Sequence, residues 1–511
     1  MDTMITSLSQ NFVAVGPEIG LTILAMVLLL LDSYLPNAKS NLGYVAAIVM
    51  AGLAVATVTI WIPDPETSQL AWGGMIRYDV LGQVFKVMVL FAGAVTSLMA
   101  VRDSDVGQKG EFYLIITIST LGGTLLAASA DMVMLFVALE TVSIPLYILA
   151  GFSRQDQRSA ESGLKYFLFG SFASALLLYG LSLLFGFTGE TRLDLMAQAL
   201  MSPDNIVAGN IFPVLIAITL VVVGFGFKIS AAPFHFWTPD VYEGAPTPVT
   251  AFISVASKAA SFAILMRFFI GVFPSELAFD GQNLQVFWTN MISIIAIVSM
   301  TLGNIFALRQ ENIKRMLAYS SIAQAGYALI GIAALSAEDT SFAISSVAFY
   351  MFMYTFSNLL VFAGVILFAE EAGTENISEY AGMQRRSPWM AFAMTVGLLS
   401  LAGIPPAAGF FGKFFLFQAA IEANLVALAI IGVLNSIVAL YYYLVVIKIM
   451  WVDPSEDEDK AIEMSPAMGW TFGVSTIVVV LLGVFPTPVI NWARDGAEAI
   501  VAVANTLISL I

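Results

Sequence analysis

The sequence of 511 residues contains no cysteine and only one histidine, His235. Without thiols the chain cannot form a disulfide or supply the cysteine ligands of an iron–sulfur cluster, and one histidine is too few for a structural zinc site. Charged residues are also scarce, at 11% of the chain, whereas a soluble domain has about 25%. The net charge of −15 argues against nucleic acid as a partner. We therefore expect no cofactor and no metal in this chain, and any redox chemistry would take place on other chains.

Hydrophobic residues make up 59% of the chain, and the mean hydropathy is +0.88. We find fourteen apolar segments long enough to cross a bilayer, because about 20 helical residues span the hydrocarbon core. They lie near 17–35, 42–62, 80–100, 111–128, 132–152, 163–187, 210–236, 247–272, 284–306, 316–334, 341–368, 388–419, 424–450 and 468–490. The first segment lacks the basic region and cleavage site of a signal peptide, so we expect it to be a membrane helix. The sequence predicts an all-α polytopic membrane protein with about 14 transmembrane helices.

The positive charges alternate between the connecting loops. Eleven lysines and arginines lie in loops after odd-numbered segments, and three lie in the loops after even-numbered segments or in the termini. By the positive-inside rule, the odd loops are cytoplasmic and both termini face the other side.

Seven of the 21 cations remain inside apolar segments: Lys86, Lys165, Lys228, Lys258, Arg267, Lys413 and Lys448. We expect Arg267 and Lys448, near helix ends, to reach toward the membrane surface. Lys86 is open to either interpretation, and Lys165, which has Glu161 nearby, is expected to be functional. Lys228, Lys258 and Lys413 have long apolar sequence on both sides, which favours a functional role.

Two segments combine such a lysine with proline. In the seventh, Pro233 follows Lys228, and in the twelfth, Pro405 and Pro406 precede Lys413. Proline cannot donate to the carbonyl four residues before it, so a carbonyl is freed close to the lysine. Charge and broken helix backbone are both costly in lipid unless they line a polar cavity. Helices 7 and 12 are therefore predicted to be broken helices on a polar path, with His235 close to the first break.

The lysine pattern repeats along the chain. Lys228 is followed by Lys258 in the next segment, and Lys413 by Lys448. Helices 4–8 and 9–13 are thus predicted to form two five-helix repeats, which are inverted because the number of helices per unit is odd. The predicted domains are three N-terminal helices (1–110), a first repeat (111–272), a second repeat (273–450) and a loop with a C-terminal transmembrane helix (451–511).

Glu140 lies near the centre of the fifth segment, and Pro145 frees the carbonyl of Thr141 beside it. An unpaired carboxylate at this depth would carry a large desolvation penalty. We therefore expect Glu140 to be protonated or paired with a lysine of a neighbouring helix. A purely structural ion pair is the alternative to a functional role.

Several motifs closely resemble subunit N (subunit 2) of the proton-translocating NADH–quinone oxidoreductase, respiratory complex I, within the antiporter-like membrane subunit family. These motifs are PFHFWTPDVYEGAPTPVTAF (233–252), LFVALETVSIPLYIL (135–149), SGLKYFLFGSFASALLLYG (162–180), RQENIKRMLAYSSIAQAGY (309–327) and LAGIPPAAGFFGKFFLF (401–417). The resemblance implies an antiporter-like fold of 14 helices with inverted repeats.

The resemblance also implies that Glu140, Lys165, Lys228, Lys258 and Lys413 are proton-relay residues. We expect Glu140 to modulate Lys228, and the proton to pass through Lys258, with His235 nearby, to Lys413 on the exit side. The chain would then be a non-redox subunit of the translocase. FMN, iron–sulfur clusters and quinone would be held by partner subunits.

The partners implied are other membrane subunits of the complex and the lipid bilayer. The location implied is the bacterial inner membrane, with the thylakoid membrane as the alternative. Two other functions remain open at this point: a subunit of a multisubunit Na⁺/H⁺ antiporter, and a scaffold subunit that conducts no protons.

Overall fold

The computed structural model describes residues 11–508 apart from 35–38, 104, 203–204, 206, 208–209, 275–276, 280–281 and 457–459. The unbroken long helices are α2 (Gly16–Tyr34), α3 (Ser40–Thr59), α4 (Val80–Ala100), α5 (Gly110–Ala128), α6 (Met132–Ala150), α7 (Gln157–Thr188), α13 (Leu284–Ala307), α14 (Ile313–Ala333), α15 (Thr340–Ala372), α19 (Val426–Trp451), α20 (Pro466–Val484) and α21 (Thr487–Ile508). Three further segments are divided: α9 (Phe212–Lys228) with α10 (Trp237–Gly244), α11 (Thr247–Phe252) with η2 (Ile253–Ser257) and α12 (Lys258–Val272), and α17 (Pro388–Ala402) with α18 (Gly409–Glu422).

Short elements complete the described chain. They are α8 (Leu193–Met201), α16 (Met383–Arg386), η1 (Trp72–Gly74), η3 (Ala334–Ser336), η4 (Ile377–Tyr380) and two small hairpins, β1 (Gln69–Ala71) with β2 (Ile76–Tyr78) and β3 (Ala278–Phe279) with β4 (Gln282–Asn283). In the described part, twelve helical spans are long and apolar enough to cross a membrane, and α9 and α17 are shorter apolar helices. The prediction of an all-α polytopic membrane protein is confirmed. The exact helix count and the inverted repeats stay predictions.

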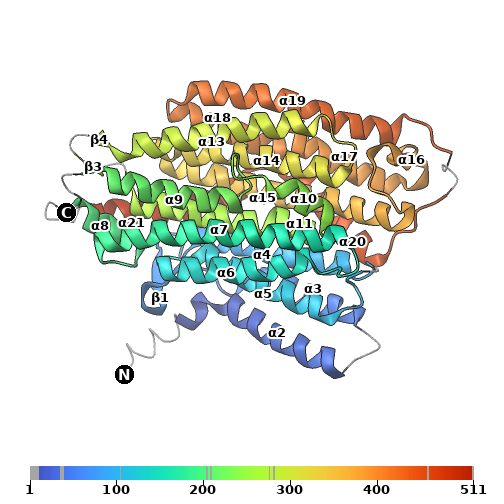
Figure 1. Ribbon diagram of the computed structural model, residues 1–511, viewed down its shortest axis with the longest axis horizontal. Coiled ribbons are helices and arrows are strands. Elements are labelled where there is room, and N and C mark those ends of the chain that lie inside the picture. The colour runs from blue at the N-terminus through green and yellow to red at the C-terminus, as the bar shows by residue number, and fades with distance from the viewer. Residues whose placement is uncertain are drawn as a thin grey trace.

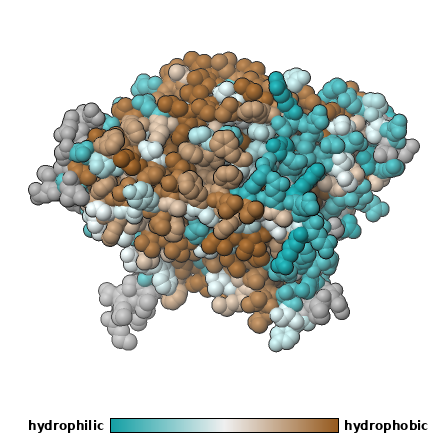
Figure 2. Space-filling model, in the orientation of Figure 1, coloured by the Kyte–Doolittle hydropathy of each residue, from teal (hydrophilic) through white to brown (hydrophobic). Residues whose placement is uncertain are grey.

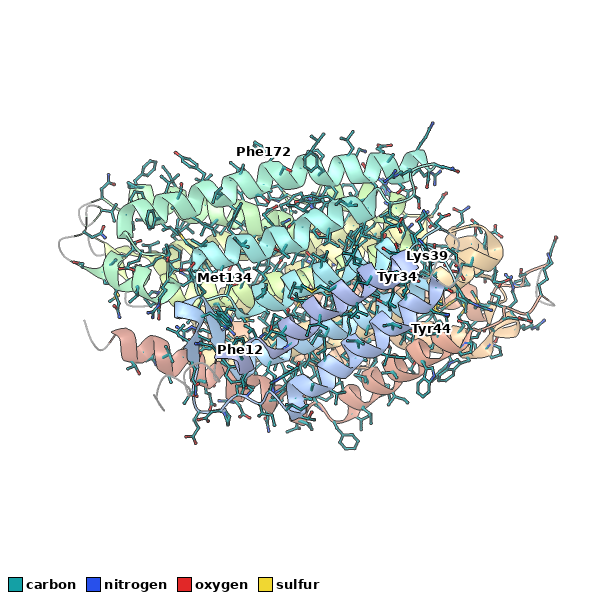
Figure 3. The ribbon with its side chains drawn as sticks, turned by 90° about the horizontal axis from the view of Figure 1, so that it is seen from below. Phe12, Tyr34, Lys39, Tyr44, Met134 and Phe172 are labelled. Carbon is teal, nitrogen blue, oxygen red and sulfur yellow. The ribbon has the colours of Figure 1, made fainter. Side chains whose placement is uncertain are left out.

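The long helices run nearly parallel to the longest axis of the molecule (Figure 1). One end of the molecule holds α8 and the β3–β4 hairpin, both of which follow even-numbered segments. The other end holds α16, which follows the eleventh segment. Figure 2 shows an apolar surface over the middle of this face and a hydrophilic strip toward the end where α16 lies. Seen from below, α2 and α3 lie side by side, with Tyr34 and Lys39 near the same end (Figure 3).

Helix α15 forms the centre of the bundle. The whole of its apolar span is buried inside the protein. It packs against α4 and α14 and also against α17, α18, α20 and α21. The broken helix α17–α18 therefore packs along the central helix of the bundle.

Three features differ from the sequence-based expectations. The last predicted segment extends to residue 490, but α20 ends at Val484 and a separate helix, α21, follows. Helix α21 is amphipathic, so counting apolar residues does not reveal it, and the side chain of its Trp492 donates to Gln83 of α4 at 3.0 Å. Helix α8 was likewise not predicted.

Arg267 was expected to reach toward the membrane surface, but the structure gives it a buried carboxylate partner instead. Its guanidinium is buried and donates to both carboxylate oxygens of Asp79, at 2.8 and 2.6 Å. Burial opposes the charge of Asp79, but Arg267, the Gly82 N–H and the Ser68 hydroxyl together hold the pKa of Asp79 at about 2. Lys448 does behave as predicted, because it is exposed and pairs with Asp453.

Lys86 forms a second buried ion pair. Its Nζ lies 2.9 Å from Glu18 of α2 and donates to the Ala14 carbonyl at 3.0 Å. Of the two interpretations of Lys86, the contacts support a structural pair that joins α2 to α4.

Candidate functional site

Three buried lysines define the candidate site. Lys228, Lys258 and Lys413 are 5%, 2% and 4% exposed. None of them forms an ion pair with a carboxylate of the described residues, and each instead donates to neutral oxygens. Lys228 and Lys258 lie at an interruption of their helix, and Lys413 lies about one turn after one. An unpaired cation in the interior of a membrane protein is a functional-site signal, because its desolvation is otherwise uncompensated.

Lys228 is the last residue of α9. Its Nζ donates to the Ser143 hydroxyl at 2.5 Å and to the Tyr147 hydroxyl at 3.1 Å, both on α6, and lies 5.2 Å from the centre of the Tyr147 ring. Two oxygens and an aromatic face can stabilise the ammonium form without a counter-ion.

The break after Lys228 is held by side-chain hydrogen bonds. Ser230 has a positive φ of 62°, and the Ala232 N–H donates to the Ser299 hydroxyl of α13 at 2.8 Å. Trp237 Nε1 donates to the Phe227 carbonyl at 3.1 Å. These bonds satisfy an N–H and a carbonyl where the chain leaves the helix, so irregular backbone is tolerated at this depth.

His235 lies inside the same break. It is buried, and its ring stacks on Phe236 with the ring centres 4.9 Å apart. Within the described residues, its Nδ1 is buried and has no hydrogen-bond partner. His235 therefore lies in the irregular segment that begins after Lys228, with its Nδ1 unpaired among the described residues. The two side chains do not form a hydrogen bond with each other.

Lys258 begins α12, directly after the π-helical turn η2. Single π turns inside α-helices occur frequently at functional sites. The Nζ donates to the carbonyl and the hydroxyl of Ser321 on α14, at 2.8 and 2.5 Å. The same hydroxyl contacts Tyr242 of α10 at 3.1 Å and Tyr354 of α15 at 3.0 Å. Lys258 thus joins a hydroxyl cluster shared by three helices.

Lys413 lies in α18, after the second break. Its Nζ donates to the Ala402 carbonyl at 3.0 Å and lies 4.4 Å from the centre of the Tyr327 ring. Gly403, which follows α17, has φ of +87°, and a Cβ there would meet the Lys413 side chain at 3.0 Å. Glycine at this position lets the chain leave the helix and leaves room for the lysine.

Glu140 has no lysine partner in the structure. It is half-buried on α6, and its Oε1 accepts from the Ser174 hydroxyl of α7 at 2.6 Å. Of the two predicted states, the pair with a lysine is not formed. Ser143, which accepts from Lys228, lies about one turn further along α6. Helix α6 therefore carries both Glu140 and a hydrogen-bond partner of Lys228.

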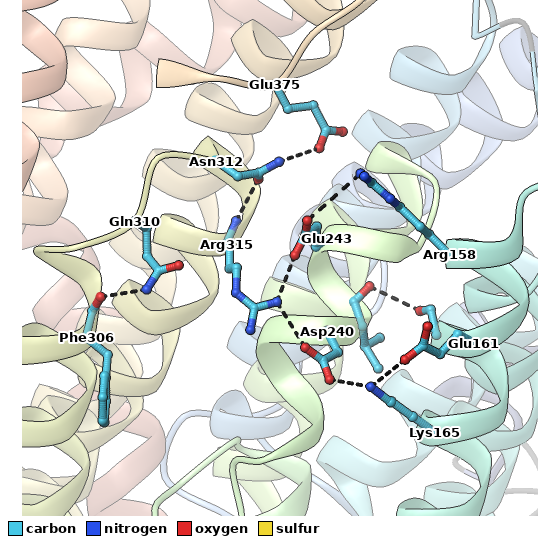
Figure 4. A network of polar contacts seen from close by, with 12 residues as sticks. Arg158, Glu161, Lys165, Asp240, Glu243, Phe306, Gln310, Asn312, Arg315 and Glu375 are labelled. Carbon is cyan, nitrogen blue, oxygen red and sulfur yellow. Dashed lines mark hydrogen bonds and ion pairs between the residues drawn. The ribbon is translucent and has the colours of Figure 1, made fainter. Parts of the chain in front are cut away.

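Lys165 belongs to a different cluster (Figure 4). Its Nζ lies 2.6 Å from Glu161 and 2.5 Å from Asp240 of α10. Arg315 of α14 continues the network, at 2.9 Å from Asp240 and 2.8 Å from Glu243. The Lys165 side chain is 34% exposed. The network ties α10 to α7 and α14, and the structure does not bring Lys165 to the three buried lysines.

Sequence reasoning missed the polar face of α14. Ser321 and Tyr327 contact Lys258 and Lys413, and Gln324 lies between them in sequence. The sequence did contain a signal for this face, because Ser321, Gln324 and Tyr327 are three residues apart inside an apolar segment. Residues at that spacing share one face of a helix. Among the residues that the structure describes, no group of three or more His, Cys, Asp or Glu side chains could hold a metal ion.

Residues 129–439 match the family described as NADH:quinone oxidoreductase/Mrp antiporter, TM. The chain is 40% identical over 506 residues to NADH-quinone oxidoreductase subunit N of Trichlorobacter lovleyi, a match that covers 98% of this chain and 100% of the relative. It is 41% identical over 503 residues to NAD(P)H-quinone oxidoreductase subunit 2 of Microcystis aeruginosa, covering 95% and 94%.

Solved structures show the same fold. A chain of respiratory complex I from Thermus thermophilus with bound aureothin is 29% identical, with a TM-score of 0.75 and coverage of 94% of this chain and 100% of that chain. A chain of the Mrp complex from a Dietzia species has a TM-score of 0.83 at 18% identity, covering 98% and 99%. The second similarity concerns the fold alone.

Proposed function

This chain belongs to the NADH:quinone oxidoreductase/Mrp antiporter family as a proton-translocating membrane subunit of an NADH–quinone oxidoreductase, and we propose that its protons pass along three buried lysines. It is a multi-pass membrane protein that works with other membrane subunits in a hetero-oligomer. Electron transfer, with FMN, iron–sulfur clusters and quinone, would belong to partner subunits, and this chain would take no part in the redox step.

The observation that carries the proposal is the shared environment of Lys228, Lys258 and Lys413. Each is buried, each lacks a carboxylate partner among the described residues, and each lies at or within one turn of interrupted helix backbone and faces hydroxyl or carbonyl oxygens. A nearby charge can then decide whether the lysine holds its proton. Moving one proton against 150 mV costs roughly 3.5 kcal/mol, which is comparable to the energy of about two pKa units, near 3 kcal/mol. Electrostatic switching is therefore of sufficient size.

The proposed order follows the helices. Glu140 would act on Lys228 through α6, and the proton would pass through Lys258, with the free nitrogen of His235 nearby, to Lys413 on the exit side. Lys165 would act at the water-exposed ion network of α7 and α10, on the cytoplasmic side. The membrane would be the bacterial inner membrane, with both termini on the non-cytoplasmic side.

The test is to replace Lys228 and Lys413 singly by alanine. We expect each variant to assemble, because packing holds a membrane helix bundle and removing a buried charge relieves its desolvation. Proton pumping in vesicles, measured per NADH oxidised, should fall sharply. Lys448→Ala is the matched control, since this lysine is exposed and paired with Asp453.

A ratio of protons to electrons equal to that of the control, in either variant, would remove that lysine from the relay. Pumping that requires Na⁺ would instead favour an Na⁺/H⁺ antiport function.

A further inference from the structure

We propose that Gln324 is a positioning residue that connects the break between α17 and α18 to the hydroxyl groups lying between Lys258 and Lys413. The inference rests on the proposed function, because it assumes that protons pass between these two lysines. Gln324 is buried in α14, between Ser321, which holds Lys258, and Tyr327, whose ring faces Lys413.

The two prolines of the break free two neighbouring carbonyls. In a continuous helix the Leu401 and Ala402 carbonyls would accept from the N–H groups of residues 405 and 406, but both of these are prolines and have none. The Leu401 carbonyl accepts from Gln324 Nε2 at 3.0 Å, and the Ala402 carbonyl accepts from Lys413 Nζ at 3.0 Å. The amide and the lysine therefore replace the two missing backbone donors side by side.

The Leu401 carbonyl determines which way the amide of Gln324 faces. A carbonyl can only accept, so the NH₂ group must face Leu401 and Oε1 must face the opposite way. Oε1 accepts from the Tyr350 hydroxyl of α15, and Nε2 also donates to the Tyr443 hydroxyl of α19 at 3.1 Å. The Tyr443 hydroxyl also lies 2.5 Å from the Ser320 hydroxyl, and either of these two groups can donate. Because an amide oxygen can only accept, the freed Leu401 carbonyl fixes Tyr350 as the donor to Gln324.

This arrangement has a consequence for proton transfer. Hydroxyl groups can pass a proton along a chain of hydrogen bonds, whereas a primary amide neither releases nor accepts one readily at neutral pH. While Leu401 holds Gln324, the Tyr350 phenol keeps one orientation. A movement of the break that releases Leu401 would free the amide and allow the Tyr350 phenol to reverse. Gln324 would therefore make transfer between Lys258 and Lys413 depend on the state of the break.

The test uses two substitutions in the assembled complex. Gln324→Met keeps the shape of the side chain and removes every polar atom, so Leu401, Tyr350 and Tyr443 lose their partner. Without the amide, these buried polar groups lose the partner that orients them, so we expect the initial rate of proton pumping to fall about tenfold or more. NADH oxidation in the presence of an uncoupler should be retained. Gln418→Met on α18 is the control, because its amide donates to Glu422, one turn along the same helix, at 2.9 Å.

The second substitution, Gln324→Glu, separates positioning from packing. The titratable groups facing Gln324 are Tyr350 of α15 and Tyr443 of α19, with Lys413 of α18 on the neighbouring carbonyl. In its protonated form the introduced carboxyl can donate to Leu401 and accept from Tyr350, so pumping should approach that of the unchanged chain at the acid end. Once ionised, it can no longer donate to Leu401, so pumping should be lost as the pH rises.

The results of these substitutions distinguish a failure of this inference from a failure of the proposed function. A pumping rate in Gln324→Glu that follows the wild-type pH profile, or one that is equally low at every pH, would overturn the positioning role. If Gln324→Met fails to assemble, the pH profile of Gln324→Glu and the rate of Tyr350→Phe, which should also be lowered, decide the question. Loss of pumping in Lys413→Ala with normal pumping in Gln324→Met would refute this inference alone, whereas normal pumping in both would also refute the proposed function.

Discussion

Replacing Asp79 by asparagine should destabilise the protein without removing a cap. Asparagine can still accept from the Gly82 N–H, which Asp79 caps at the start of α4 at 2.8 Å. It carries no charge, so the buried guanidinium of Arg267 loses its counter-ion. The change therefore isolates the ion pair that joins α4 to the far end of the helix that begins at Lys258.

Two independent estimates give the magnitude. Removing one partner of a buried ion pair costs about 3–5 kcal/mol. The pKa of Asp79 is lowered from 3.8 to about 2, and a difference of nearly two units corresponds to about 2–3 kcal/mol. Because this pKa is lowered on folding, its contribution is complete above pH 3.8 and is lost as the pH falls toward 2. The destabilisation by Asp79→Asn should therefore be the same throughout the range from about pH 5 to 8.

The assay is the loss of assembled complex when membranes are heated, followed on native gels. Asp79→Asn should lower the midpoint temperature, and the double variant Asp79→Asn with Arg267→Met should recover part of the loss, because the unpaired cation is removed. The recovery is only partial, since the Ala127 carbonyl loses the donor that Arg267 provides at 2.9 Å. A midpoint unchanged in the single variant, or lower still in the double variant, would refute the reasoning.

Three further predictions concern topology, the second break and Lys165. In the cysteine-free chain, Gln157→Cys should react with an impermeant thiol reagent from the cytoplasmic side and Glu66→Cys only from the other side; the reverse pattern would contradict the orientation. A Cβ on Gly409 would lie 1.7 Å from the Ser400 carbonyl oxygen, so Gly409→Ala should reduce pumping and assembly, whereas Gly186→Ala, with nothing within 4 Å, should change neither. Lys165→Gln should slow pumping with little effect on heat stability, because a partly exposed ion pair contributes at most about 1 kcal/mol; unchanged pumping would exclude Lys165 from proton transfer.

The sequence predicted the parts of the site that depend on local backbone chemistry. Proline removes a specific hydrogen bond wherever it stands, so Pro233 and the pair at 405 and 406 marked both breaks. Lysine in an apolar span is costly in any fold, so Lys228 and Lys413 were found without knowledge of their neighbours.

Partners could not be predicted in the same way. Arg267 meets Asp79 across 188 residues of sequence, and hydropathy gives the depth of a side chain but not the helix that it faces. The same limit applies to Glu140, whose partner proved to be Ser174 rather than a lysine. Gln324 was missed for another reason: an uncharged amide hardly changes the hydropathy of its segment, although its spacing from Ser321 and Tyr327 was visible.

The central position of α15 has a consequence for how the protein is made. The helix has 33 residues, about 50 Å at 1.5 Å per residue, and it must enter the bilayer during synthesis while lipid still surrounds it. Four of the helices that later cover it, α17, α18, α20 and α21, follow it in the chain. Its apolar character thus serves insertion, while its fit to neighbouring helices serves the finished bundle. A ribosome that stopped before α20 would release a chain with its innermost helix open to lipid on one side.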